Sequence, residues 1–290
     1  EYFVYFCPPP PPSRASHGAS RHAGLGGAGG STLGYLKNNI RKWLQENDAG
    51  SEIPAGWQFL HIDTPALREY VQEGVDPRLS DDEYLGLIAQ GVTFDSVAAM
   101  IDGNVGLNDE MQTWRVDPTG LPVAISRSAG QFRAVGATLA VAHAPMIRSR
   151  IERSLARLNR SDANSELAKV YHQVTGERRP GTSSSLRVIV VSSLCGGTGA
   201  GLLQTVSDIS RSLDHGGHEI AFLYTAEVFD SLGAASTGGV SPNSLAAISE
   251  FLNGSWRDHH FDGSRPPLER FSLVRAGLPQ ALSRSGPDLP

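Results

Sequence analysis

Cysteine is scarce in this sequence: of 290 residues, only Cys7 and Cys195 are cysteines. Two cysteines do not make a disulfide framework, so we expect a protein of the reducing cytoplasm. No stretch of the sequence is apolar for long enough to span a bilayer, so no membrane partner is expected. Lysine is also rare, at Lys37, Lys42 and Lys169, whereas arginine is frequent, a bias typical of a GC-rich bacterial gene.

The sequence also lacks a large excess of charge of one sign. The net charge is −5, and no basic stretch is interleaved with aromatic residues, which argues against nucleic acid as a partner. Hydrophobic residues make up 40% of the chain, which is enough for a real core. The sequence therefore indicates a globular protein whose ligand has to be sought in its motifs.

The most informative motif lies near the middle of the chain, where residues 188–191 read Val-Ile-Val-Val, typical of a strand covered on both faces. A glycine-rich turn follows, and a helix is predicted over residues 201–213. Glycines let peptide N–H groups approach an anion closely, and a helix N-terminus adds its positive end. The motif therefore predicts a phosphate cradle, formed by Gly196, Gly197, Thr198, Gly199, Ala200 and Gly201.

Two familiar phosphate loops fit this turn poorly. A Walker loop needs Lys and then Ser or Thr after the last glycine, but Gly201 is followed by two leucines. A Rossmann fingerprint needs the spacing G-x-G-x-x-G, whereas these glycines alternate. The pattern small-Gly-Gly-Thr-Gly-small-Gly between a strand and a helix resembles the signature of the tubulin and FtsZ superfamily. Cys195 stands where that family usually has Ser, Ala or Gly, and its small size predicts that it is tolerated.

The resemblance, nearest to bacterial tubulin-like proteins of the cytoskeleton, implies an α/β fold: a three-layer Rossmann-like GTPase domain with a mainly parallel sheet. It implies GTP as ligand, with Mg²⁺ bound through the phosphates and no metal site of the protein's own. A glycine cluster ahead of an amphipathic stretch, residues 33–44, is similar to the family's first phosphate loop. A turn after residue 126 looks like the third. These two loops add the phosphate-binding candidates Gly26, Gly27, Ala28, Gly29, Ala129, Gly130 and Gln131.

Three further residues are candidates for ribose or base. Asp63 ends a strand predicted over residues 57–64, in a position that the family places beside the nucleotide. It could hydrogen-bond ribose or base, act through water on a metal, or simply turn the chain. By resemblance, Asp230 is the candidate for ribose, and Asn243 would support the loop geometry or lie near the sugar. Both also fit ordinary roles in a turn or a helix cap.

The expected domain organisation is a disordered proline-rich segment over residues 1–23, a nucleotide-binding domain over 24–275 and a disordered tail over 276–290. Family members have a hydrophobic strand directly before the first loop, but residues 16–23 are too polar to predict a buried one. Either residues 2–6 fill that position or the strand is missing. Short helices are expected over residues 81–90 and 94–100, and a continuous helix after residue 136, through residues 139–155.

The resemblance implies a GTP-binding protein with possible head-to-tail, GTPase-linked assembly. In this family, a segment after a central helix activates water in the neighbouring subunit's pocket. The sequence shows no such segment, so hydrolysis is expected to be slow or absent, and no catalytic residue is assigned. One alternative is a non-enzymatic nucleotide-binding scaffold. Another is a Rossmann-type dinucleotide-binding enzyme in which Asp63 holds the ribose.

Overall fold

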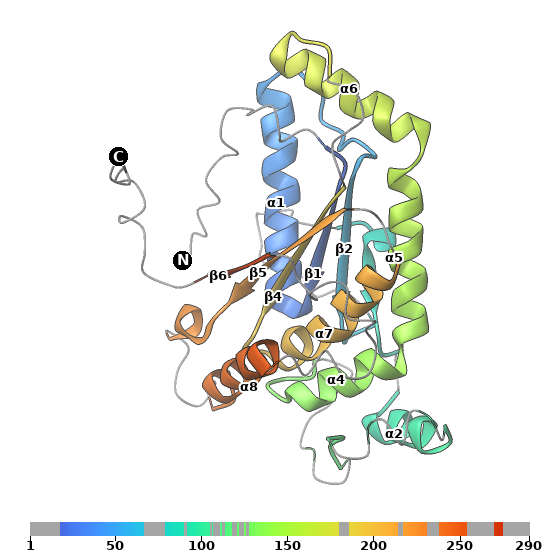
Figure 1. Ribbon diagram of the computed structural model, residues 1–290, viewed down its shortest axis with the longest axis vertical. Coiled ribbons are helices and arrows are strands. Elements are labelled where there is room, and N and C mark those ends of the chain that lie inside the picture. The colour runs from blue at the N-terminus through green and yellow to red at the C-terminus, as the bar shows by residue number, and fades with distance from the viewer. Residues whose placement is uncertain are drawn as a thin grey trace.

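A parallel β-sheet with helices on both faces forms the framework of the protein (Figure 1). The computed structural model describes residues 18–66, 79–89, 92–104, 106, 111, 114–117, 121, 125, 128–179, 186–213, 217–230, 238–253 and 270–274. The three-layer α/β architecture expected from the sequence is confirmed. The segments expected to be disordered at residues 1–17 and 276–290 lie outside the described residues.

The described residues include six strands, all parallel, in the order β3-β2-β1-β4-β5-β6. From β1 the chain continues to β2 on one side, and from β4 it continues to β5 on the other. The strand order therefore reverses between β1 and β4, and ligands of open α/β sheets bind outside the carboxyl ends of the strands at such a point. The bounds are β1 Ser20–Leu25, β2 Trp57–Asp63, β3 Tyr84–Gly86, β4 Arg187–Ser193, β5 His218–Tyr224 and β6 Arg270–Val274.

Helix α1 covers one face of the sheet, and α5 and α7 cover the other (Figure 1). Alternate side chains of β4 pack on opposite faces of the sheet. Val188 and Val190 join the core beneath α7, while Ile189 and Val191 pack toward α1. Burial on both faces explains the unbroken β-branched run. The helices are α1 Gly26–Glu46, α2 Phe94–Asp102, α4 Arg133–Ala142, α5 Ala144–Leu158, α6 Ser161–Thr175, α7 Gly197–Ser212 and α8 Val240–Asn253, with 3₁₀ turns η1 Asp81–Glu83 and η3 Ala226–Phe229.

The first strand corrects a prediction made from the sequence. Residues 20–23 were expected in a disordered segment, yet they belong to β1, a central strand whose six residues are all buried. The Arg21 guanidinium donates to Ser210 Oγ at 3.3 Å, and the charge of Glu219 acts on it favourably. The His22 ring stacks on Phe59 with centroids 4.9 Å apart. These polar residues can lie in a buried strand because Ser210 and Phe59, which are distant in sequence, contact them. A local sequence pattern cannot reveal such partners.

Several helix boundaries also differ from the prediction, among them the start of α7, which is Gly197 and not Gly201. The expected helix over residues 81–90 is only the turn η1, because the next residues pair with β2 as strand β3. The helix expected through residues 139–155 is interrupted at His143, where α4 ends and α5 begins with Pro145 in its first turn. α1 starts at Gly26, earlier than residue 33, so the glycine cluster is part of the helix.

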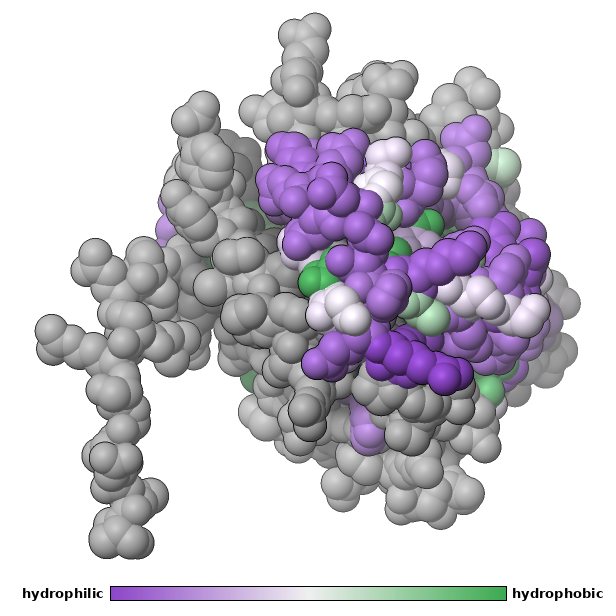
Figure 2. All heavy atoms as spheres, turned by 90° about the horizontal axis from the view of Figure 1, so that it is seen from above, coloured by the Kyte–Doolittle hydropathy of each residue, from purple (hydrophilic) through white to green (hydrophobic). Residues whose placement is uncertain are grey.

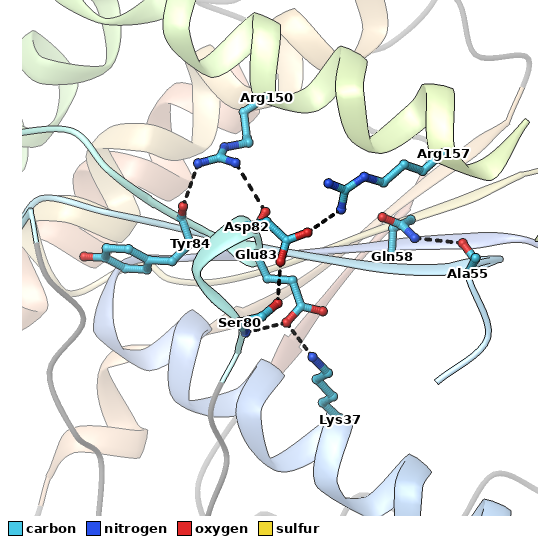
Figure 3. Close-up of polar contacts among 9 residues, drawn as sticks. All are labelled: Lys37, Ala55, Gln58, Ser80, Asp82, Glu83, Tyr84, Arg150 and Arg157. Carbon is cyan, nitrogen blue, oxygen red and sulfur yellow. Dashed lines mark hydrogen bonds and ion pairs between the residues drawn. The ribbon is translucent and has the colours of Figure 1, made fainter. Parts of the chain in front are cut away.

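Charged side chains fix η1 and the edge strand β3 between α1 and α5 (Figure 3). Lys37 Nζ lies 2.5 Å from Glu83 Oε2, and Arg157 Nη1 lies 2.7 Å from Asp82 Oδ2. Arg150 donates to the carbonyl oxygens of Asp82 and Tyr84. Hydrogen bonds from Ser80 and Arg157 hold the pKa of the Asp82 carboxyl below its usual range. These contacts secure the short strand β3 next to β2, which carries Asp63.

The end of the molecule at α6 is predominantly hydrophilic where the described residues reach its surface (Figure 2). Hydrophobic residues are scattered in small spots between the polar ones on this face. Scattered single hydrophobic residues are normal for a protein surface. The glycine-rich turns lie at the opposite end, the lower end in Figure 1, where α1, α4 and α7 begin.

Candidate functional site

The N-termini of α1, α4 and α7 meet at the carboxyl ends of β1 and β4. None of the three helices has a side-chain cap at its N-terminus, and none has an acidic residue in its first turn. The first N–H groups of a helix lack intrahelical partners and carry the positive end of the dipole. Proteins usually satisfy them with a Ser, Thr, Asp or Asn cap. Three uncapped helix ends in one place provide a concentration of N–H donors suited to an anion.

The first glycine turn and the signature turn are in direct contact. Gly26 has φ +66°, and a Cβ there would lie 2.7 Å from Gly199 N. A Cβ on Gly199 would lie 2.9 Å from Leu25 O and 2.8 Å from Ser192 Oγ. Both glycines are therefore needed to bring the starts of α1 and α7 together, because any side chain would force the two backbones apart.

Hydrogen bonds hold the signature turn to its neighbours. Leu194 N donates to Tyr224 O at 3.0 Å, and Cys195 N donates to Ser193 Oγ at 3.0 Å. Gly197 N donates to Gly130 O at 2.7 Å. The Gly197 N–H, expected to contact phosphate, is thus engaged within the protein. The N–H groups of Thr198 and Gly199 also belong to the first turn of α7, where they have no partner within the helix.

The glycines of the site divide into two groups. A Cβ on Gly27 or Gly196 would meet nothing within 4 Å, so these two positions face open space. A Cβ on Gly201 would lie 2.4 Å from Ala137 N, and one on Gly136 would lie 2.2 Å from Gly197 O. Gly201 and Gly136 therefore allow α4 and α7 to pack backbone against backbone. Among the glycines of the first turn and the signature turn that were expected to contact phosphate, Gly27 and Gly196 are the ones that leave room for it.

The third loop contacts both the signature turn and α8. Gly130 has φ +55°, and its N–H donates to Ser128 Oγ at 3.0 Å. Gln131 Oε1 accepts from Gly239 N at 2.5 Å. Ala129 is fully buried. Arg133, the first residue of α4, forms a bidentate ion pair with Glu250 of α8. This loop is thus built into the framework around the site.

Asn243 and Asp230 occupy different surroundings. Asn243 Nδ2 donates to Gln131 O at 2.7 Å and to Cys195 O at 2.9 Å, so this amide joins α8 to both loops. This geometry favours the loop-supporting role of Asn243. Asp230 is exposed at the end of η3, and its N–H donates to Glu227 O at 3.5 Å. The described contacts do not bring Asp230 to the glycine turns, and its role toward ribose stays a prediction.

Asp63 lies at the carboxyl end of β2, next to two residues that sequence reasoning missed. Its Oδ1 accepts from Thr64 N at 2.8 Å, and its Oδ2 lies 3.5 Å from His61 Nε2. His61 Nε2 also lies 3.1 Å from Gly26 O, and Thr64 Oγ1 lies 2.7 Å from Thr198 Oγ1. The alternation of the strand was the available signal, since it places His61 and Asp63 on the same face.

Cys195 behaves as a small neutral residue within the signature turn. It is a free, buried cysteine, and burial raises the pKa of its thiol. The thiol therefore stays protonated at neutral pH and adds no charge to the site. Its surroundings explain why a cysteine can take the place of the family's Ser, Ala or Gly.

The described residues show neither a ready-made metal site nor a membrane span. They contain no group of three or more His, Cys, Asp or Glu side chains able to hold a metal ion. Within these ranges, no helix combines the length and apolar character needed to cross a membrane.

Comparison with known proteins agrees with the geometry. A protein-family model described as tubulin-like matches residues 23–274, from β1 to the end of β6. No curated protein and no solved structure matches the sequence. The family match covers most of the chain and includes both glycine turns, the third loop and α8. The chain belongs to the tubulin-like family.

Proposed function

We propose that this protein binds GTP, with Mg²⁺ on its phosphates, where α1, α4 and α7 begin. The observation that carries the proposal is the meeting of three uncapped, acid-free helix N-termini at the reversal of strand order. Membership of the tubulin-like family supports guanine as the base. The phosphates would take N–H donors from the first turns of α1 and α7 and occupy the open space at Gly27 and Gly196.

The remaining site residues have supporting roles in this proposal. Asp63, fixed by Thr64 N, would reach the ribose, the base or a water on the metal. Asn243 would keep the loops around Gln131 and Cys195 in place. When bound, Mg²⁺ neutralises phosphate charge. The protein contributes backbone dipoles, which need no protonation to act.

A binding assay tests the proposal directly. Labelled GTP, ATP and NAD are titrated with the protein in the presence of Mg²⁺, and a preference for GTP is expected. A preference for NAD would overturn the proposal in favour of a dinucleotide-binding enzyme. Binding of all three nucleotides with equal affinity would remove the argument for guanine and leave only a general phosphate site.

Two valine variants locate the phosphates. Gly27→Val and Gly196→Val put side chains into open space and should fold normally, yet lower GTP affinity by about tenfold or more, because they obstruct the N–H donors. Gly103→Val is the matched control, since a Cβ there meets only ordinary contacts at 3.5 Å in α2's C-terminal cap. Unchanged affinity in both test variants would place the ligand elsewhere.

We also propose head-to-tail self-association, supported by the family assignment. The apolar side chains of Phe132 and Leu245, at the start of α4 and early in α8, are exposed and available for such contacts. Slow phosphate release is expected from isolated chains, because in this family the neighbouring subunit supplies part of the hydrolytic machinery. Light scattering with GTP tests assembly. A flat trace at high protein concentration, together with GTP binding, would support a non-enzymatic scaffold instead.

A further inference from the structure

We propose that His61 is a positioning residue that orients the first turn of α1 toward bound phosphate. This inference rests on the proposed nucleotide site and adds a residue that the glycine motifs do not include. His61 lies on β2, one strand away from the reversal of strand order, and its register partner on β1 is Gly24. Its imidazole ring therefore reaches the first turn of α1 from strand β2.

A continuous chain of polar contacts runs through His61. Its Nε2 lies 3.1 Å from Gly26 O and 3.5 Å from Asp63 Oδ2. Because both neighbours are acceptors, Nε2 carries the proton and donates. Asp63 Oδ1 accepts from Thr64 N, and Thr64 Oγ1 lies 2.7 Å from Thr198 Oγ1. The chain thus joins the start of α1 to the start of α7 through the carboxyl end of β2.

The imidazole ring is confined between α1 and the ring of Tyr84. It lies against Gly30 of α1, where an added Cβ would be 2.1 Å from the ring carbon Cε1. On another side, the ring of Tyr84 meets it edge-on, with centroids 5.1 Å apart and planes at 67°. Only 7% of His61 is exposed. The glycine at position 30 is therefore explained by the space that the ring takes, and not by contact with phosphate.

The hydrogen bond at Gly26 O determines where the next N–H points. In a trans peptide the C=O and the following N–H lie in one plane and point in opposite directions. By holding Gly26 O toward the sheet, His61 aims the N–H of Gly27 away from it, at an exposed position where an added Cβ would meet nothing within 4 Å. Gly26 has φ +66°, which few residues adopt, so the hydrogen bond from His61 helps to stabilise this turn. His61 acts through this peptide and not through contact with the ligand.

Binding measurements on substituted proteins test the proposal. His61→Leu keeps the volume but removes the donor, and it should weaken GTP binding in the presence of Mg²⁺ by about tenfold. His61→Gln can return an N–H close to the position of Nε2 and should recover affinity to within about threefold of the original. His61→Asn is polar but too short to reach Gly26 O, and should bind as weakly as the leucine variant. The rescue by Gln separates a positioning role from mere packing.

His22 provides the matched control. It is also 7% exposed, and it lies on the neighbouring strand β1, two rows before the Gly24–His61 row, where it stacks on Phe59 and not on the glycine turn. His22→Leu should leave GTP affinity unchanged. Equal affinity of His61→Leu and the original protein, or an equal loss in His22→Leu and His61→Leu, would overturn the proposal.

A measurement without nucleotide separates this proposal from the proposed function. In the free protein, amide hydrogen exchange of a peptide covering residues 24–32 should be faster in His61→Leu and His61→Asn than in the original and in His22→Leu. If the original protein binds none of the nucleotides, the proposed function fails, and this exchange result alone decides the role of His61. Unchanged exchange in both His61 variants would overturn that role whatever the protein binds.

Discussion

The hydroxyl oxygens of Thr64 and Thr198 lie 2.7 Å apart, although 134 residues separate them in sequence. Thr64 follows β2, and Thr198 stands in the first turn of α7. Thr64 is fully buried and Thr198 is 5% exposed. The contact joins the end of one strand to a helix that follows another, and so helps to fix the position of the signature turn.

A double-mutant cycle on this pair measures the strength of the contact. Thr64→Val or Thr198→Val should each lower the free energy of unfolding by about 1–2 kcal/mol, because a buried hydroxyl loses its partner. The double variant should cost less than the sum, with a coupling energy of about 1 kcal/mol. Urea unfolding of the four proteins provides the values. Strict additivity would show that the two hydroxyls do not depend on each other.

Alanine substitutions in the two groups of glycines should differ in their effect on the free energy of unfolding. Gly201→Ala should lower the free energy of unfolding by about 1–3 kcal/mol, because its Cβ would lie 2.4 Å from Ala137 N and 2.6 Å from Arg133 O in the tightly packed α4–α7 contact. Gly27→Ala should be neutral or raise it by about 0.5 kcal/mol, since the position is open and lies in a helix. Thermal unfolding without nucleotide compares the two. A stable Gly201→Ala would mean that α4 and α7 are less closely packed than the structure shows.

The sequence predicted the part of the fold whose signals are local. The run Val188–Val191 followed by glycines predicted β4 and the helix after it, although α7 begins at Gly197 and not at Gly201, and Pro242 in the first turn predicted α8. β1 was missed because Arg21 and His22 look like surface residues until Ser210 and Phe59 are placed beside them. Such partners come from other strands and helices, so no window along the chain contains them.

The site was predicted as a set of segments but not as individual contacts. Spacing identified the glycines of both turns, yet it could not separate Gly27, which faces open space, from Gly201, which packs on α4. That distinction depends on which backbone lies opposite each glycine. His61 was missed for a related reason, since its partner Gly26 O belongs to a turn 35 residues earlier.

His22 should make the stability of the protein sensitive to mild acid. Burial lowers its pKa from the usual 6.5 to about 4, although the hydrogen bond with Gln58 O opposes this. Between these two values the unfolded chain binds the proton more readily than the folded one, so stability is lost as pH falls from about 6.5 toward 4. The loss from this group is about 2–3 kcal/mol. Urea unfolding at pH 7 and pH 4.5 measures it.

The variant His22→Leu isolates this contribution. It should remove most of the acid sensitivity while keeping an apolar contact with Phe59. The pKa of His143 is also lowered by burial, and its smaller effect of the same sign remains in both proteins. An acid sensitivity as large in His22→Leu as in the original would show that His22 is protonated in the folded state.

Asn243 offers a test between supporting the loops and contacting the nucleotide. Asn243→Asp replaces a donor amide by a carboxylate that would face the carbonyl oxygens of Gln131 and Cys195. We expect a loss of about 2–3 kcal/mol in the free energy of unfolding even without nucleotide, because two hydrogen bonds are lost and the carboxylate repels the two carbonyl oxygens. Asn39→Asp makes the same chemical change at an exposed position of α1 and should have little effect. An unchanged unfolding curve combined with weakened GTP binding would instead assign Asn243 a direct contact with the ligand, because only a residue that the free protein does not need could behave in that way.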